Sequence, residues 1–157
     1  MAMNFEISAA QTNRLFTHCL EQLEAHPRWV ASPQLSHAQN MLMAYLRMDK
    51  IAEEEGFAAL IAQGWGKTVL DGALAETLAQ WGIDVLPQIL RQAAVHYREL
   101  GEKIEAQAPD ELREAFPQFA PLDEEYFIEC EEIFPQVYTY VRAHYDDFAA
   151  LLDFQAD

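Results

Sequence analysis

Apolar residues recur at the spacing of an α-helix along most of the chain, and no segment of four to eight residues alternates as a strand does. The most regular stripe lies in a helix expected over residues 84–107 and consists of Leu86, Ile89, Leu90, Ala93, Tyr97, Leu100 and Ile104. The chain has 157 residues, 51% of them hydrophobic, which is enough for one buried core. The sequence therefore predicts an all-α fold, a single compact domain over residues 1–157 with about six to eight helices.

Capping residues and prolines set the expected helix boundaries. Ser8 and Ser32 are predicted N-caps for the first two helices, the second of which is interrupted at Gly56. Asp123 is predicted to cap a helix that ends near residue 134, and Pro135 to open the last one. The expected helices run over residues 8–26, 33–55, 71–81, 84–107, 123–134 and 135–152.

The balance of charge excludes several functions. The chain has 26 acidic and 10 basic residues, for a formal net charge of −16. Such a protein repels nucleic acid backbones and anionic membrane surfaces, and no apolar run approaches the roughly 18 residues of a membrane span. The N-terminus lacks the pattern of a signal peptide, and Cys19 and Cys130 are expected as reduced thiols. We therefore expect a cytoplasmic protein whose partner is another, basic protein.

The acidic residues are concentrated in the last third of the chain. Residues 98–157 hold 16 acidic and 4 basic residues, whereas residues 1–97 hold 10 and 6. No Lys or Arg occurs between Arg113 and Arg142. The acidic residues of that interval that form our first candidate binding group are Glu114, Asp123, Glu124, Glu125, Glu129, Glu131 and Glu132.

A helical projection of residues 123–134 separates apolar from acidic side chains. One face is predicted to be buried and carries Tyr126, Phe127, Cys130, Ile133 and Phe134; the opposite face carries the glutamates. Ile128 is the one apolar residue among these glutamates, free to touch a partner or a second subunit. Since none of the glutamates has a base nearby in sequence, they are the strongest candidates for a binding surface.

A second candidate group consists of Glu99, Glu102 and Glu105, which lie opposite the apolar stripe of helix 84–107. A simpler explanation is that these acids form local ion pairs on the surface of a soluble helix, because a basic residue stands four positions away from two of them. The expected local pairs are Glu99–Lys103, Arg98–Glu102, Lys50–Glu54 and Asp110–Arg113.

No motif supports catalysis, a cofactor or a metal site. The five histidines form no Glu-x-x-His pattern, although His18 and His96 each precede a glutamate by three residues. The Gly64-Trp65-Gly66-Lys67-Thr68 segment lacks the first glycine of a phosphate-binding loop and is predicted to be a turn with Trp65 packed inward.

Three segments resemble a known protein family. They are Ile51–Phe57 with the following Leu60, Ile61 and Gly64; Ala79–Gly82; and Phe119–Phe127. Together they are similar to an acidic, all-helical bacterial family, formerly catalogued as a domain of unknown function, that includes a DNA mimic. Many relatives have an Asn-Gly-Gly-Phe sequence where this chain has Glu54-Glu55-Gly56-Phe57, so this chain carries additional acidic side chains there.

The resemblance implies a protein, often a homodimer, that occupies the DNA-binding face of a helix-turn-helix transcription factor and competes with operator DNA. By the same resemblance, Glu53, Glu54 and Glu55 would stand in for phosphates together with the acids of residues 123–132. Two alternatives stay open: an ordinary acidic adaptor domain that binds proteins through an apolar centre, and a metal-dependent enzyme that uses histidines and glutamates of facing helices.

Overall fold

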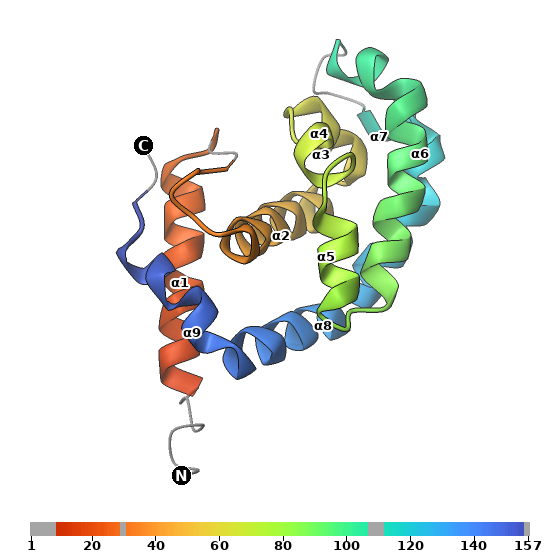
Figure 1. Ribbon diagram of the computed structural model, residues 1–157. Coiled ribbons are helices and arrows are strands. Elements are labelled where there is room, and N and C mark those ends of the chain that lie inside the picture. The colour runs from red at the N-terminus through yellow and green to blue at the C-terminus, as the bar shows by residue number, and fades with distance from the viewer. Residues whose placement is uncertain (1–8, 29–30, 107–111, 156–157) are drawn as a thin grey trace.

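All regular elements within the described residues, 9–28, 31–106 and 112–155 of the computed structural model, are helices (Figure 1). The predicted all-α class is thereby confirmed. None of these helices is long and apolar enough to cross a membrane. In chain order the α-helices are α1 (Ala9–Ala25), α2 (His37–Glu54), α3 (Phe57–Ala62), α4 (Gly66–Val69), α5 (Leu74–Gln80), α6 (Val85–Glu105), α7 (Leu112–Ala115), α8 (Ala120–Ala143) and α9 (Tyr145–Phe148). Two 3-10 turns cover Pro117–Phe119 and Ala149–Asp153.

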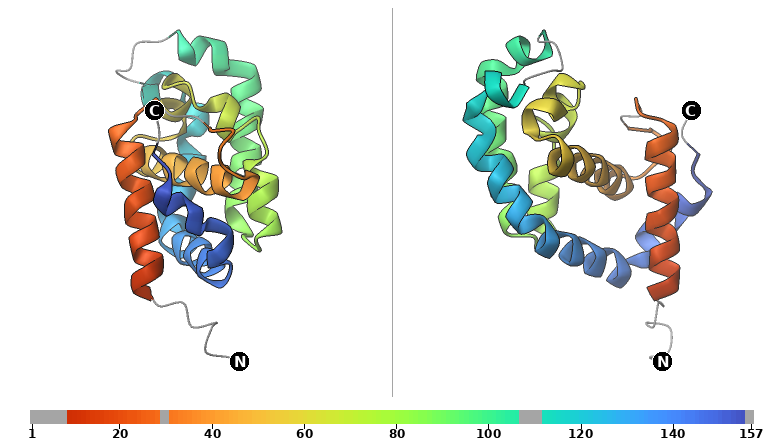
Figure 2. Two further views of the ribbon diagram at one scale, coloured as in Figure 1. Left: turned by 60° about the vertical axis from the view of Figure 1, so that its left-hand side comes forward. Right: turned by 180° about the vertical axis from the view of Figure 1, so that it is seen from behind.

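Helix α2 is the centre of the molecule. Its residues Leu42 to Met48 are all buried, so neighbours surround this part of the helix. An α-helix that is apolar on every side is stable only inside a core. Helices α1, α3, α5 and α8 all contact α2, and α1 and α6 lie on opposite sides of it (Figures 1 and 2). Its N-cap is Ser36, which forms a capping box with Gln39, so the prediction of Ser32 was four residues early.

One charged residue, Arg47, lies inside this apolar part of α2. A guanidinium nitrogen, Nη2, donates to the carbonyl oxygens of Leu23, at 3.1 Å, and His26, at 2.9 Å. These carbonyls belong to the C-terminal end of α1, which has no further turn to satisfy them. The guanidinium also lies 4.8 Å from the ring centre of Trp65, which is buried as predicted. Arg47 therefore joins α1, α2 and the turn before α4.

Replacement of Arg47 by methionine is expected to lower the free energy of unfolding by about 2–4 kcal/mol, because both carbonyls lose a charge-assisted donor. Lysine at this position should restore only part of that loss, since it lacks the planar fork and the stacking surface. Urea denaturation of the two variants measures the difference. Equal stability of wild type and Arg47→Met would contradict the role assigned to this contact.

Helix α8 is longer than predicted because it continues through Pro135. The expected break at this residue is wrong: α8 runs from Ala120 to Ala143 as one helix. Proline cannot donate the backbone hydrogen bond to the carbonyl four residues earlier, which bends a helix without ending it when packing holds both halves. Figure 2 shows α8 curving around the bundle, and its contacts include α2 and α6 as well as α1 and α9.

Candidate partner-binding surface

The buried face of α8 is one narrow stripe. It consists of Leu122, Tyr126, Cys130, Ile133, Val137 and Val141. The glutamates point away from it: Glu124, Glu125, Glu131 and Glu132 are exposed, and Glu129 is half-buried. Among the described residues, no ion pair involves any of these five. Projection of the sequence thus correctly placed the glutamates on the outside of this helix.

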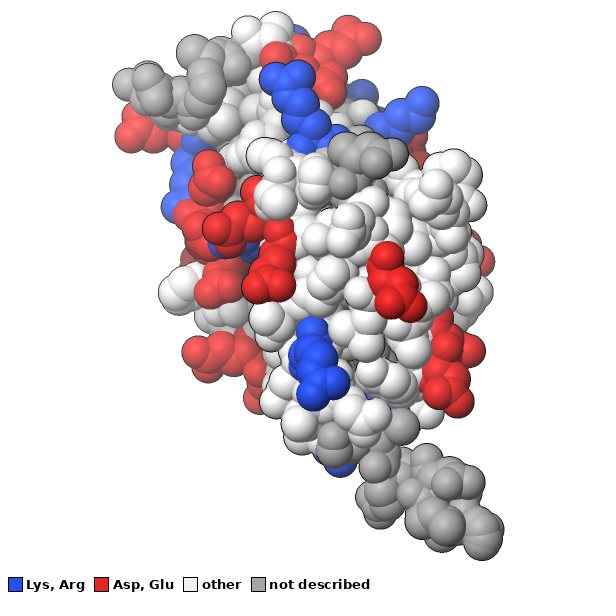
Figure 3. Space-filling view, turned by 90° about the vertical axis from the view of Figure 1, so that its left-hand side faces the viewer, with Lys and Arg blue, Asp and Glu red and all other residues white. Residues whose placement is uncertain are grey.

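Acidic side chains are also unevenly spread over the face of the molecule that Figure 3 shows. In Figure 3, which views the molecule from the α1 side, they crowd along the left edge, which is the back of the molecule in Figure 1. Much of the broad face beside this edge is uncharged. We call the outward side of α8 from Glu124 to Glu132 the α8 acidic face.

Phe127 was predicted on the buried side of α8, and the structure shows that this is wrong. The side chain is 66% exposed, and its neighbour Ile128 is 64% exposed. At 100° per residue, Phe127 lies 100° from Tyr126, whereas the stripe that contacts α2 and α6 is centred close to Tyr126. In the helical projection, Phe127 lies at the margin of the apolar arc. The part of this arc that other helices cover is narrower than the arc itself, and Phe127 falls outside it. Two large apolar side chains therefore lie beside the glutamates.

Asp123 has a different environment from the glutamates that follow it. Its side chain is only 13% exposed, and Oδ1 accepts a hydrogen bond of 2.9 Å from the backbone N–H of Phe57. Oδ2 lies 3.9 Å from Nε of Arg113. Burial raises the pKa of this carboxyl, and the Phe57 N–H and the Arg113 guanidinium oppose the rise. Asp123 thus caps the start of α3, not its own helix.

Two of the segments that carry the family resemblance meet at this contact. Gly56 has φ of +96° and lets the chain turn from α2 into α3 beside the Asp123 carboxylate. The rings of Phe57 and Tyr126 pack edge to face, with centroids 5.9 Å apart. The Glu-Gly-Phe segment and the start of α8 therefore form one structural junction. The sequence alone did not show this contact, because the two motifs lie far apart along the chain.

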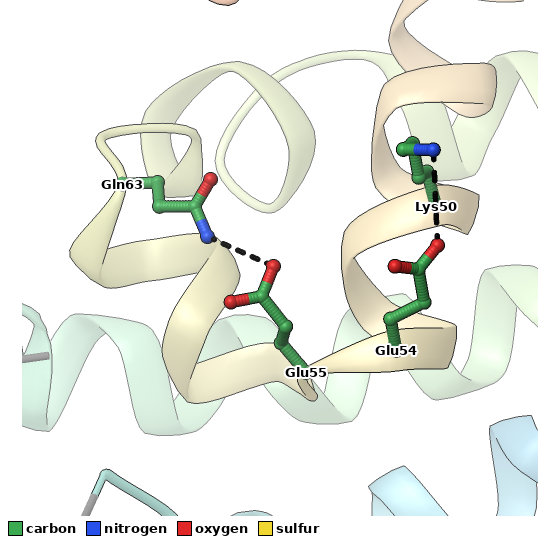
Figure 4. A network of polar contacts seen from close by, with 4 residues as sticks. All are labelled: Lys50, Glu54, Glu55 and Gln63. Atoms are coloured by element: carbon green, nitrogen blue, oxygen red, sulfur yellow. Dashed lines mark hydrogen bonds and ion pairs between the residues drawn. The ribbon is translucent and has the colours of Figure 1, made fainter. Parts of the chain in front are cut away.

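The junction brings acids of α2 and α8 together. Glu53, Glu54, Asp123 and Glu124 line one surface depression of about 460 Å³, along with Arg113, Ala120 and Phe127. We call it the α2–α8 depression. The predicted pair of Lys50 with Glu54 is confirmed, with Nζ 3.8 Å from Oε2 (Figure 4). Glu55 instead accepts a hydrogen bond of 3.4 Å from Gln63 Nε2 (Figure 4).

The second candidate group lies elsewhere. Glu99, Glu102 and Glu105 are exposed on α6 and line a different depression of about 440 Å³, which shares no lining residue with the first. Arg98 and Lys103 also line it, so its charge is mixed. Arg98 pairs with Asp71, at 3.8 Å, and not with Glu102; within the described chain, Glu99 and Lys103 form no ion pair either. Glu114 is exposed on α7, and Asp110 lies outside the described residues.

The half-buried carboxyl of Asp49 accepts a hydrogen bond from the hydroxyl of Tyr126 beneath the α8 acidic face. Burial raises the pKa of Asp49 above its usual 3.8, the Tyr126 hydroxyl opposes the rise, and the nearby charge of Glu53 adds to it. A raised pKa means that the folded protein binds this proton more tightly than the unfolded chain does.

The free energy of unfolding is therefore expected to increase as the pH falls through the raised pKa of Asp49 toward 3.8. The same contribution is lost when the pH rises again through that pKa. Urea denaturation at a series of pH values between about 7 and 4 measures this effect. Asp49→Asn should flatten the profile. A variant profile parallel to that of the wild type would show that Asp49 does not contribute.

Of the two histidines that suggested a metal site, His18 makes a hydrogen bond and His96 makes a ring contact. His18 Nε2 lies 2.9 Å from the carbonyl oxygen of Phe154, and the His96 ring packs on Phe119 with centroids 5.3 Å apart. In the part of the chain that the structure describes, no three His, Cys, Asp or Glu residues are grouped so that they could hold a metal ion.

Two comparisons with known proteins point to one family. A family model described as DMP19-like protein matches residues 33–144, the range that contains every helix from α2 to α8 and therefore the junction. A protein named "DNA mimic protein DMP19" from Neisseria meningitidis serogroup B (strain ATCC BAA-335 / MC58) is 32% identical over 120 residues, which cover 73% of each chain.

Proposed function

This chain belongs to the DMP19-like protein family, and from that premise we propose that it binds the DNA-binding face of a helix-turn-helix transcription factor and thereby blocks operator binding. The family is one of DNA mimics, which are binding proteins and not enzymes. The α8 acidic face is the part of this chain that we assign to the contact, because its glutamates are outward and have no ion pairs within the described residues.

The spacing of these carboxylates supports the proposal. Side chains three and four residues apart on a helix stand about 5–6 Å from each other, and a DNA strand carries a phosphate about every 3.4 Å of rise. A row of glutamates on α8, widened by Glu53 and Glu54 across the α2–α8 depression, gives a dense band of negative charge. Proteins that hold phosphates through Lys and Arg would accept such a band, and its field would speed their association.

The alternative is an acidic adaptor domain whose contact centres on apolar groups. Affinity capture separates the two: immobilised protein is incubated with a native bacterial extract, and bound proteins are eluted with a salt gradient or with duplex DNA. DNA mimicry predicts that known DNA-binding proteins elute at moderate salt and that duplex DNA releases them. Retention through the salt gradient with no effect of DNA would favour the adaptor.

Homodimer formation, which the resemblance implies, stays a prediction that sedimentation velocity checks. We also propose that the protein acts in the cytoplasm, where its DNA-binding partner is found, and that it does not itself bind nucleic acid, since its charge repels phosphates.

A further inference from the structure

The α2–α8 depression contains an exposed aromatic ring as well as carboxylates. Phe127 forms part of its lining, together with Glu124 on the same helix and Glu53 and Glu54 at the end of α2. A phenylalanine with 66% of its surface exposed gains little from burial in the folded chain. It therefore offers free apolar area and an aromatic ring to a partner.

The charges in the depression define what the ring is suited to bind. Asp123 forms an ion pair with Arg113, and Glu54 forms an ion pair with Lys50. Glu53 and Glu124 are exposed and form no ion pair with any described residue. The depression thus combines two free carboxylates with an aromatic ring, the pair of groups that a cationic side chain with a flat surface contacts best.

Arginine fits this combination better than lysine. Its planar guanidinium stacks on an aromatic ring, presents several donors to carboxylates at once and is more weakly hydrated than an ammonium group. The chain's own Arg113 shows that a guanidinium is accommodated here, since it lines the same depression and lies 3.9 Å from Asp123.

We propose that the α2–α8 depression receives an arginine side chain of the basic partner, which stacks on Phe127 and is hydrogen-bonded by Glu53 and Glu124. The proposal rests on the proposed function, because a DNA-binding partner presents the arginines that hold phosphates. It adds a component that the phosphates of a duplex lack, since the aromatic bases of duplex DNA are stacked on one another and present only their edges in the grooves. The depression thereby gives the acidic surface a preference for arginine over lysine.

The preference is tested with two labelled probes, octaarginine and octalysine, whose binding to the full chain is followed by fluorescence anisotropy at fixed ionic strength. Wild type is expected to bind octaarginine several-fold more tightly. Phe127→Leu, which keeps apolar area but removes the ring, should weaken octaarginine binding about five- to tenfold and octalysine binding less than twofold. Phe127→Trp should preserve the difference between the probes.

Leu20→Ala is the control, because Leu20 is an exposed apolar side chain on α1 that lies outside the α8 acidic face and does not line the depression. It should leave both affinities unchanged. Equal wild-type affinity for the two peptides, or a preference that survives in Phe127→Leu, would overturn the proposal. So would a change of sedimentation coefficient in Phe127→Leu, which would mean that the ring faces a second copy.

Failure of this proposal is distinguishable from failure of the proposed function. The difference between the two peptides, and its dependence on Phe127, reports on the depression, whereas release of captured proteins by duplex DNA reports on mimicry. A surface that binds both peptides equally well yet loses its partner to DNA would still be a DNA mimic.

Discussion

Replacing Glu125, Glu129 and Glu132 together with glutamine is expected to weaken the complex with the DNA-binding partner by about 30- to 100-fold at low salt. Each exposed ion pair contributes up to about 1 kcal/mol, so three amount to about 2–3 kcal/mol, and about 1.4 kcal/mol is a factor of ten. The wild-type affinity should fall steeply as salt is added, and the variant's should fall less. Isothermal titration at several salt concentrations measures both effects.

The same variant is expected to fold at least as well as the wild type. Glu125 and Glu129 stand four residues apart, and such like-charged pairs destabilise a helix by about 0.2–0.5 kcal/mol. A loss of binding without a loss of stability separates a contact role from a structural one. Thermal unfolding followed by circular dichroism provides that comparison.

A second triple variant is the matched control for net charge. Glutamine at Glu99, Glu102 and Glu105 removes the same three charges from α6, where Arg98 and Lys103 line the same depression. We expect a loss of less than about fivefold, since neighbouring bases already screen that site. If the α6 variant loses as much affinity as the α8 variant, overall charge governs binding and the α8 acidic face has no special role.

Gly56→Ala is expected to lower the free energy of unfolding by about 2–4 kcal/mol. The backbone there has φ of +96° and ψ of 170°, a region open essentially to glycine alone, and the strain costs about 1–3 kcal/mol. A Cβ would also come within 2.8 Å of Asp123 Oδ2 and displace the carboxylate that caps α3, a loss of about 1 kcal/mol. Urea denaturation measures the total.

Gly82→Ala separates the two contributions. Its φ of +89° is similar, but a Cβ there meets nothing within 4 Å. This variant should show the backbone strain alone and lose less stability than Gly56→Ala. Equal losses would contradict the added cost that we assign to the crowded position of Gly56.

Local patterns in the sequence predicted whatever depends on a single helix. The stripe from Leu86 to Ile104 gave α6 to within two residues at its C-terminal end, and projection of residues 123–134 gave the outward glutamates. Periodicity suffices in these cases because each helix turns one continuous apolar stripe toward the core.

What sequence could not predict depends on contacts between segments far apart in the chain. Helix α8 continues through Pro135 because packing contacts hold the helix on both sides of this residue. Asp123 caps α3 because the fold brings the backbone N–H of Phe57 beside its carboxylate. Phe127 is exposed because the covered stripe is narrower than the apolar arc. The meeting of Glu53 with Glu124 follows from the same junction, and no spacing rule gives it.

The central claim, that the chain takes the place of DNA, is tested most directly by displacement. A transcription factor recovered by the capture experiment is bound to a fluorescent duplex carrying its operator, and the protein is added while anisotropy is recorded. The account predicts that anisotropy falls to the value of free DNA, and that the α8 triple variant needs about 30- to 100-fold more protein for the same release. A rise in anisotropy, which reports a ternary complex on the DNA, or no change at saturating protein, would contradict it.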